Sequence, residues 1–137
     1  MMKLILGFTL LLSIGQAFGK AEVYFISPKD GEKLKSGNVE VVFGLKGMGI
    51  APAGINAENT GHHHLLVDYK GLPDLSKPLP AGENLIHFGG GQTQTTIKLG
   101  HGTHKLRLIL ADYLHTPHKP TIMSKEITIF VENGKKS

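Results

Sequence analysis

The sequence contains no cysteine and no tryptophan among its 137 residues, and Arg107 is its single arginine. The lack of cysteine excludes disulfides, thiolate metal ligands and a cysteine nucleophile. Proteins that bind nucleic acids usually gather arginines, lysines and aromatic residues on one face. Here the lysines are scattered, the formal net charge is only +4 and aromatic residues make up 7% of the chain. We therefore expect no nucleic-acid partner.

Long apolar runs are absent after the first twenty residues. Lys3 precedes an uncharged, mostly apolar run over residues 4–15, and Ala17-Phe18-Gly19 offers the small residues that a signal peptidase accepts. That run is too short to span a bilayer comfortably. These features predict a signal peptide over residues 1–19 and one domain over residues 20–137. They also predict a periplasmic or secreted location, with no membrane span after cleavage.

Short stretches in which apolar and polar residues alternate are separated by turn residues. In the clearest of them, Leu106, Leu108 and Leu110 face one side, whereas Lys105 and Arg107 face the other. A period of two residues indicates strands, and the proline and glycine clusters indicate the turns between them. We expect seven strands, at residues 21–26, 39–46, 62–69, 84–88, 92–99, 104–112 and 126–131. The predicted fold is all-β, an immunoglobulin-like antiparallel β-sandwich of about seven strands.

Three consecutive histidines begin the third predicted strand. Because successive side chains of a strand point to opposite faces, His62 and His64 share one face, whereas His63 shares the other with Leu65 and Val67. We expect His63 to belong to the core and the other two rings to project together.

The predicted topology brings most of the other histidines to the same place. If strand directions alternate, the loops at residues 47–61, 89–91 and 113–120 gather at one end of the sandwich. Six of the eight histidines then lie at that end, whereas His101 and His104 lie at the other. The candidate metal ligands are therefore His62, His64, His87, His115 and His118. Possible additional contributors are His63, Met48, Met123, Asp112 and His104.

Clustered imidazoles without thiols are typical of a transition-metal site. Neutral imidazole is the commonest ligand of zinc and copper, thioether sulfur favours Cu(I), and the general order of affinities favours copper over zinc. We expect copper first and zinc second, with Asp112 and Asp68 as acceptors that fix the ring tautomers.

Two other functions are compatible with the same residues. The histidines would only anchor loops in a non-catalytic module that binds an envelope protein or another ligand, such as a sugar. An enzyme is less favoured, because no serine lies in a Gly-x-Ser-x-Gly turn, although a metal with an open coordination position supports catalysis.

Several motifs together resemble a bacterial exported family of unknown function. The segment Gly61-His62-His63-His64-Leu65-Leu66 is the most specific of them. The others are residues 47–54, 59–68, 87–89, 91–93 and 102–104, followed by Asp112, His115, Pro117 and His118. The resemblance covers nearly the whole chain after the signal peptide. It implies a small, stand-alone, exported domain with histidine-rich segments, and it implies no activity.

Overall fold

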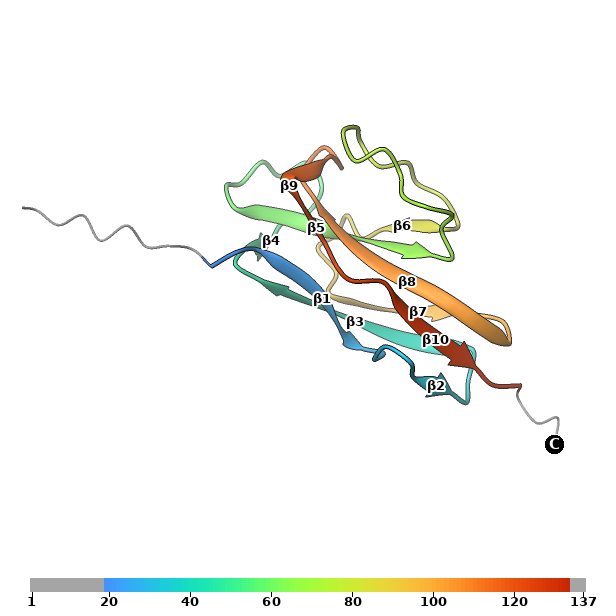
Figure 1. The fold of residues 1–137 in the computed structure, drawn as a ribbon. Helices are drawn as coiled ribbons and strands as arrows, with labels where there is room; N and C mark the ends of the chain where they lie inside the picture. Colours follow the sequence, from blue (N-terminus) through green and yellow to red (C-terminus); the bar gives the residue numbers. More distant parts are fainter. Residues whose placement is uncertain (1–18, 134–137) are drawn as a thin grey trace, which may run out of the picture.

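The computed structural model describes residues 19–133, so almost all of the predicted signal peptide lies outside the described residues. Within this range the chain forms strands and no helix, which confirms the all-β prediction (Figure 1). The ten strands are β1 (Glu22–Ser27), β2 (Lys33–Leu34), β3 (Asn38–Lys46), β4 (Gly49–Ile50), β5 (Thr60–Val67), β6 (Leu85–His87), β7 (Gln94–Lys98), β8 (Gly102–Ala111), β9 (Pro117–Met123) and β10 (Ile127–Val131).

The strands form two sheets that pack face to face as a sandwich. One sheet has the order β1-β3-β7, and the other has the order β2-β10-β8-β5-β4, with β6 beside β5 and β9 beside β8. Most pairs are antiparallel, and the two-residue strands β2 and β4 pair in parallel. The immunoglobulin-like topology stays a prediction.

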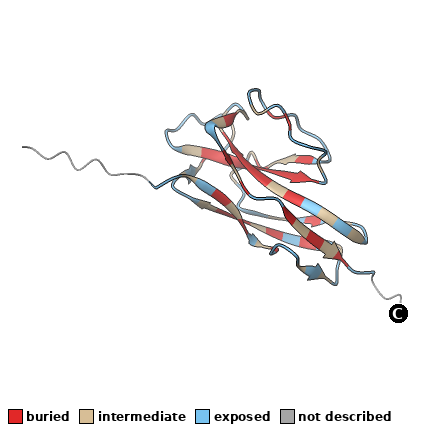
Figure 2. Ribbon diagram, viewed as in Figure 1, coloured by how far each residue is buried: buried red, intermediate tan, exposed pale blue. Residues whose placement is uncertain are grey.

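The main core lies between the sheets, and a smaller one lies on the outer face of β5 and β8. Leu106, Leu108 and Leu110 are fully buried in the main core, as the alternation predicted. On the opposite face of β8, Ile109 and Ala111 are also fully buried, beneath the segment that joins β5 to β6. The C-terminal half of strand β8 is therefore buried on both faces (Figure 2).

The main error of the strand prediction lies between residues 113 and 123. The expected loop over residues 113–120 ends early, because Pro117–Met123 forms β9 against β8. Its prolines suggested a loop, since proline cannot donate a ladder hydrogen bond. Proline is tolerated on an edge strand, however, and β9 has a partner on one side only. The short strands β2 and β4 were also missed.

The three loops that were expected at one end do meet there. The amide of Ala53 donates to the carbonyl oxygen of Gly89 at 2.8 Å, and the amide of Gly54 donates to that of Tyr113 at 2.9 Å. These bonds join the segments that follow β4, β6 and β8. The histidine-bearing segments are thereby held around the start of β5.

Candidate metal centre

The centre is built on β5, whose three histidines are almost completely buried. His62 and His64 are 0% exposed and His63 is 1% exposed. His62 pairs with Ala111 of β8, and His64 lies between Ile109 of β8 and His87 of β6. Alternation along β5 therefore directs His62 and His64 to the outer face, where loops cover them.

A third ring joins these two from the loop between β8 and β9. The Nδ1 atom of His115 lies 3.0 Å from Nε2 of His62 and 3.4 Å from Nε2 of His64. One ring nitrogen from each of the three residues lies within 4.8 Å of the others. Tetrahedral ligands at the usual zinc–nitrogen distance of about 2.0–2.1 Å are separated by about 3.3 Å. In the group of His62, His64 and His115, named here the histidine triad, the two separations from His115 thus match those of ligands around one ion.

The two strand-borne rings of the triad are neutral at physiological pH. Burial first, then the neighbouring rings of His115 and His87, lowers the pKa of His62 to about 4. Burial and then the adjacent ring of His62 lower the pKa of His64 to about 3. Neutral imidazole is the form that binds metal ions, because its lone pair is free.

Hydrogen bonds do not satisfy the nitrogens of these rings. The Nδ1 atoms of His62 and His64 are buried and have no hydrogen-bond partner in the described part of the chain. Their Nε2 atoms both face a single nitrogen of His115, and one shared nitrogen cannot satisfy two neutral rings. Each unsatisfied buried group costs about 1–3 kcal/mol. The arrangement is therefore poorly suited to stability alone, whereas a cation accepts all three lone pairs at once.

The loop that carries His115 is held in an unusual conformation. The φ angle of His115 is 64°, which lies in the left-handed region and costs roughly 1–2 kcal/mol for a residue other than glycine. The carboxylate of Asp112 accepts hydrogen bonds from the amides of Leu114 and Thr116, at 2.8 and 2.9 Å. Asp112 was expected to orient a ring. It instead bonds the backbone on both sides of His115.

His87 lies beside the triad but outside it. Its ring stacks on that of His115, with centroids 4.7 Å apart, and meets the edge of the His64 ring at 4.4 Å. Its Nε2 atom lies 3.2 Å from the carbonyl oxygen of Pro80. Burial is also the main cause that lowers the pKa of His87.

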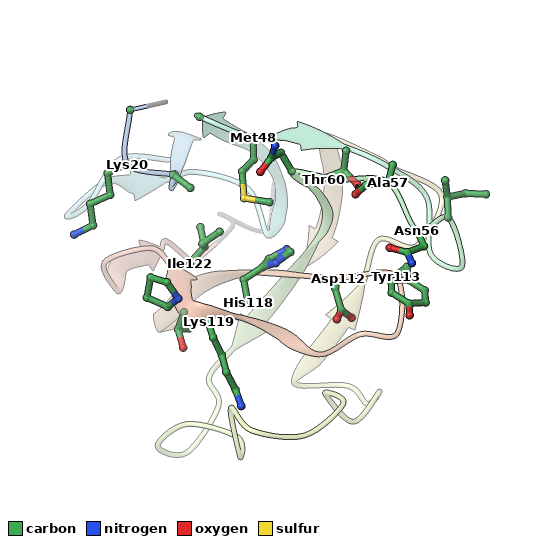
Figure 3. Close-up of a pocket in the computed structure, with 17 residues that line it drawn as sticks. Lys20, Met48, Asn56, Ala57, Thr60, Asp112, Tyr113, His118, Lys119 and Ile122 are labelled. Carbon is green, nitrogen blue, oxygen red and sulfur yellow. Dashed lines mark hydrogen bonds between the residues drawn. The ribbon is translucent and has the colours of Figure 1, made fainter. Parts of the chain in front are cut away.

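His118 occupies a different environment, on the inner side of β9. It lines a cavity of about 660 Å³ together with Met48, Asp112 and Tyr113 (Figure 3). Its Nε2 atom is buried without a hydrogen-bond partner, and it lies against Gly61, where a Cβ atom would come within 2.8 Å of it. The structure thus separates His118 from the triad, although the two lie on either side of the same strand.

The remaining candidates lie away from the triad nitrogens. His63 points into the main core, where its ring lies 4.9 Å from that of Phe43. Met48 packs against the main core, and Met123 packs against the smaller one, with its sulfur 3.9 Å from a guanidinium nitrogen of Arg107. Within residues 19–133, neither methionine sulfur is found in contact with a ring nitrogen of the triad.

The opposite end of the sandwich uses its histidines for hydrogen bonding. His104 bonds the carboxylate of Asp68 at 2.7 Å and the carbonyl oxygen of Gly100 at 2.8 Å. His101 bonds the carbonyl oxygen of Val131 at 2.9 Å. Because Asp68 is engaged with His104 and with the amide of Lys105, it does not orient the triad rings as expected.

Two contributors to the centre were missed by the sequence analysis. The carbonyl oxygen of Pro80 faces His87, and the amide of Leu79 donates to the carbonyl oxygen of His115 at 2.8 Å. Both contacts are made by backbone groups, which every residue type has, so the sequence does not indicate that these residues bond the histidines. The three prolines of this segment, Pro73, Pro78 and Pro80, predict only a stiff connection without strand character.

Fold and site together define a class: an all-β sandwich with a cluster of three histidines, two of them buried, whose ring nitrogens lie close enough together to hold a metal ion. A family model for a domain of unknown function, DUF4399, matches residues 41–132, and the chain belongs to this family. No curated protein and no solved structure matches the chain significantly. Across the described residues, no helix has both the length and the apolar character needed to cross a membrane.

Proposed function

We propose that this protein is an exported domain that binds a transition metal ion, copper first and zinc second, through His62, His64 and His115. One observation carries the proposal: Nδ1 of His115 lies 3.0 and 3.4 Å from the Nε2 atoms of His62 and His64. Storage, delivery or sensing of the ion requires only binding. The small-residue motif at residues 17–19 supports export.

The energetic balance favours an ion over an empty cluster. When both Nε2 lone pairs bind an ion, the N–H groups of His62 and His64 lie on their partnerless Nδ1 atoms. That arrangement costs about 1–3 kcal/mol for each ring. Structural zinc sites supply apparent binding free energies of about 10–16 kcal/mol, so coordination outweighs the penalty.

The choice of copper rests on the nitrogen ligands rather than on sulfur. Met48 and Met123 pack in the two cores, so thioether preference for Cu(I) does not contribute at the triad. Three imidazoles suit both Cu(II) and Zn(II), and the general order of affinities places copper higher.

Calorimetric titration of the domain with Cu(II), Cu(I) and Zn(II) tests this function. We expect one saturable site that binds more tightly than micromolar. The variant His115→Gly removes a ring and also relieves the left-handed backbone, and it should weaken binding at least tenfold. His101→Ala is the matched control, because His101 lies at the opposite end and should leave affinity unchanged. Absence of saturable binding in the parent protein would rule the function out.

The second candidate is a ligand-binding or envelope-interaction module, which the cavity of about 660 Å³ favours. Its volume lies within the usual range for small-molecule sites, about 300–1,000 Å³, and Asn56, Tyr113 and His118 offer polar groups along its wall. His118→Ala separates the two candidates. It should leave metal affinity intact if the triad is the site, and it should abolish binding of a small ligand if the cavity is.

A further inference from the structure

We infer that His87 is a fourth, exchangeable metal ligand, which links the ion to the loop over residues 70–82. The inference rests on the proposed metal-binding function and adds a coordination partner and a route for release. It begins from the position of the His87 ring, which touches two of the triad rings. Its centroid lies 4.4 Å from that of His64 and 4.7 Å from that of His115.

The hydrogen bond of His87 decides which of its nitrogens is available. A carbonyl oxygen only accepts hydrogen bonds, so the neutral ring of His87 must carry its N–H on Nε2, where it donates to the carbonyl oxygen of Pro80. The lone pair is then on Nδ1. Metal-bound histidines characteristically donate their other N–H to a carbonyl or carboxylate. His87 already has this partner, whereas the Nδ1 atoms of His62 and His64 have none.

The four rings differ in burial, so some are fixed in place whereas His87 has room to move. His62 and His64 are fully buried on β5. His87 is half-buried, at the end of the three-residue strand β6, and its ring is stacked on His115 and lies outside the close group of triad nitrogens. A shift of this ring that keeps the Nε2 bond to Pro80 brings Nδ1 to an ion held by the other three, and the reverse shift opens a position for transfer.

The same residue connects the ion to the loop over residues 70–82. Pro80 bonds His87, the amide of Leu79 donates to the carbonyl oxygen of His115, and the side chain of Leu79 is buried in the smaller core. Two adjacent loop residues are therefore tied to two histidines of the cluster. When His87 binds the ion, its ring is fixed and Pro80 is held with it. The amide hydrogens of this loop should therefore exchange more slowly with solvent.

Spectroscopy of the Cu(II)-loaded protein tests the inference, with His87→Ala compared with the parent. Nitrogen hyperfine structure should indicate four imidazoles in the parent and three in the variant. The variant should bind Cu(II) about tenfold more weakly, release it faster to a chelator, and recover the fourth nitrogen when free imidazole is added. His101→Ala should behave as the parent. His87→Gln keeps a side chain of similar polarity and serves if the alanine variant does not fold.

Hydrogen exchange over residues 70–82 supplies a second readout. Copper should slow exchange there in the parent and less so in His87→Ala. A variant with the coordination, release rate and loop protection of the parent would overturn the inference while the proposed function stands. A parent that binds no ion would instead remove the proposed function itself.

Discussion

The carboxylate of Asp112 accepts hydrogen bonds from the two amides that flank His115, at 2.8 and 2.9 Å. The same turn is closed by backbone bonds from Asp112 to Thr116 and from His115 to Asp112, each 2.9 Å. These contacts hold His115 at a φ angle of 64° and direct its ring toward β5. The third ligand of the triad therefore depends on a residue that touches no ring nitrogen.

Asp112→Ala should weaken metal binding and destabilise the protein. Loss of the two bonds to backbone amides should reduce the free energy of unfolding by about 1–3 kcal/mol, and metal affinity should fall on the order of tenfold. Asp112→Asn keeps an acceptor oxygen and should retain most of the affinity. Calorimetry and urea unfolding measure both effects.

A matched control separates the two roles of Asp112. Asp30 also accepts a backbone bond, from the amide of Thr128 at 2.8 Å, far along the sequence from the triad loop. Asp30→Ala should reduce stability without reducing metal affinity. Equal affinity in the Asp112→Ala and Asp30→Ala variants would show that Asp112 does not position His115.

The stability of the metal-free protein should decrease as pH falls from about 6.5 to 4. Burial lowers the pKa of His62 and of His63 to about 4, and that of His64 to about 3, from 6.5 in the unfolded chain. Between these values the unfolded chain binds protons that the folded protein does not, so protonation favours unfolding. Each ring contributes up to about 1.4 kcal/mol per pH unit. Urea unfolding across this range measures the slope.

His104 has the opposite effect on the pH dependence of stability, but it does not reverse the loss of stability at low pH. Burial alone would lower its pKa, yet the hydrogen bonds to Asp68 and Gly100 outweigh burial and raise its pKa. Its stabilisation is present at low pH and is lost as pH rises through the folded value. One partly exposed ring does not offset three buried ones. His63→Leu removes one of the three, so a pH profile identical to that of the parent would contradict the assignment.

Gly61→Ala should destabilise the protein because the added Cβ atom has no space. It would lie 2.6 Å from the carbonyl oxygen of Ala111 and 2.8 Å from Nε2 of His118. Overpacking of this kind costs about 1–3 kcal/mol. Gly100→Ala, where no atom lies within 4 Å of the added Cβ atom, is the control for urea unfolding. An equal loss of stability in the two variants would mean that the neighbours of Gly61 move apart at little cost to admit the Cβ atom.

A bound metal ion should stabilise the folded protein in proportion to its affinity. At a hundred times the dissociation constant the gain is about 2.7 kcal/mol, which corresponds to a rise in melting temperature on the order of 10 °C. Differential scanning calorimetry with Cu(II), and then with added EDTA, should show the rise and its reversal. In His115→Gly the rise should be much smaller. An equal rise there would indicate that the ion binds elsewhere.

The strands were predictable from the sequence because alternation is a local property. The pattern of Leu106, Leu108 and Leu110 needs only the two-residue period of a strand, and the same rule separated His63 from His62 and His64. Strand β9 was not predictable in this way. Its prolines are acceptable only because the sheet places it at an edge, and that position is decided by partners distant in sequence.

The sequence by itself determined that the protein is all-β, that it lacks thiol chemistry and that two histidines of β5 share a face. The tertiary structure alone decided which of the other rings join them. His115 meets His62 although they are 53 residues apart, whereas His118, three residues later, turns to the inner side of β9. The physical reason is that ligands converge through strand pairing and loop closure. The Asp112 carboxylate bonds backbone amides, and Pro80 bonds His87 through its backbone carbonyl. Every residue type has these backbone groups, so the sequence alone does not show which of them make such bonds.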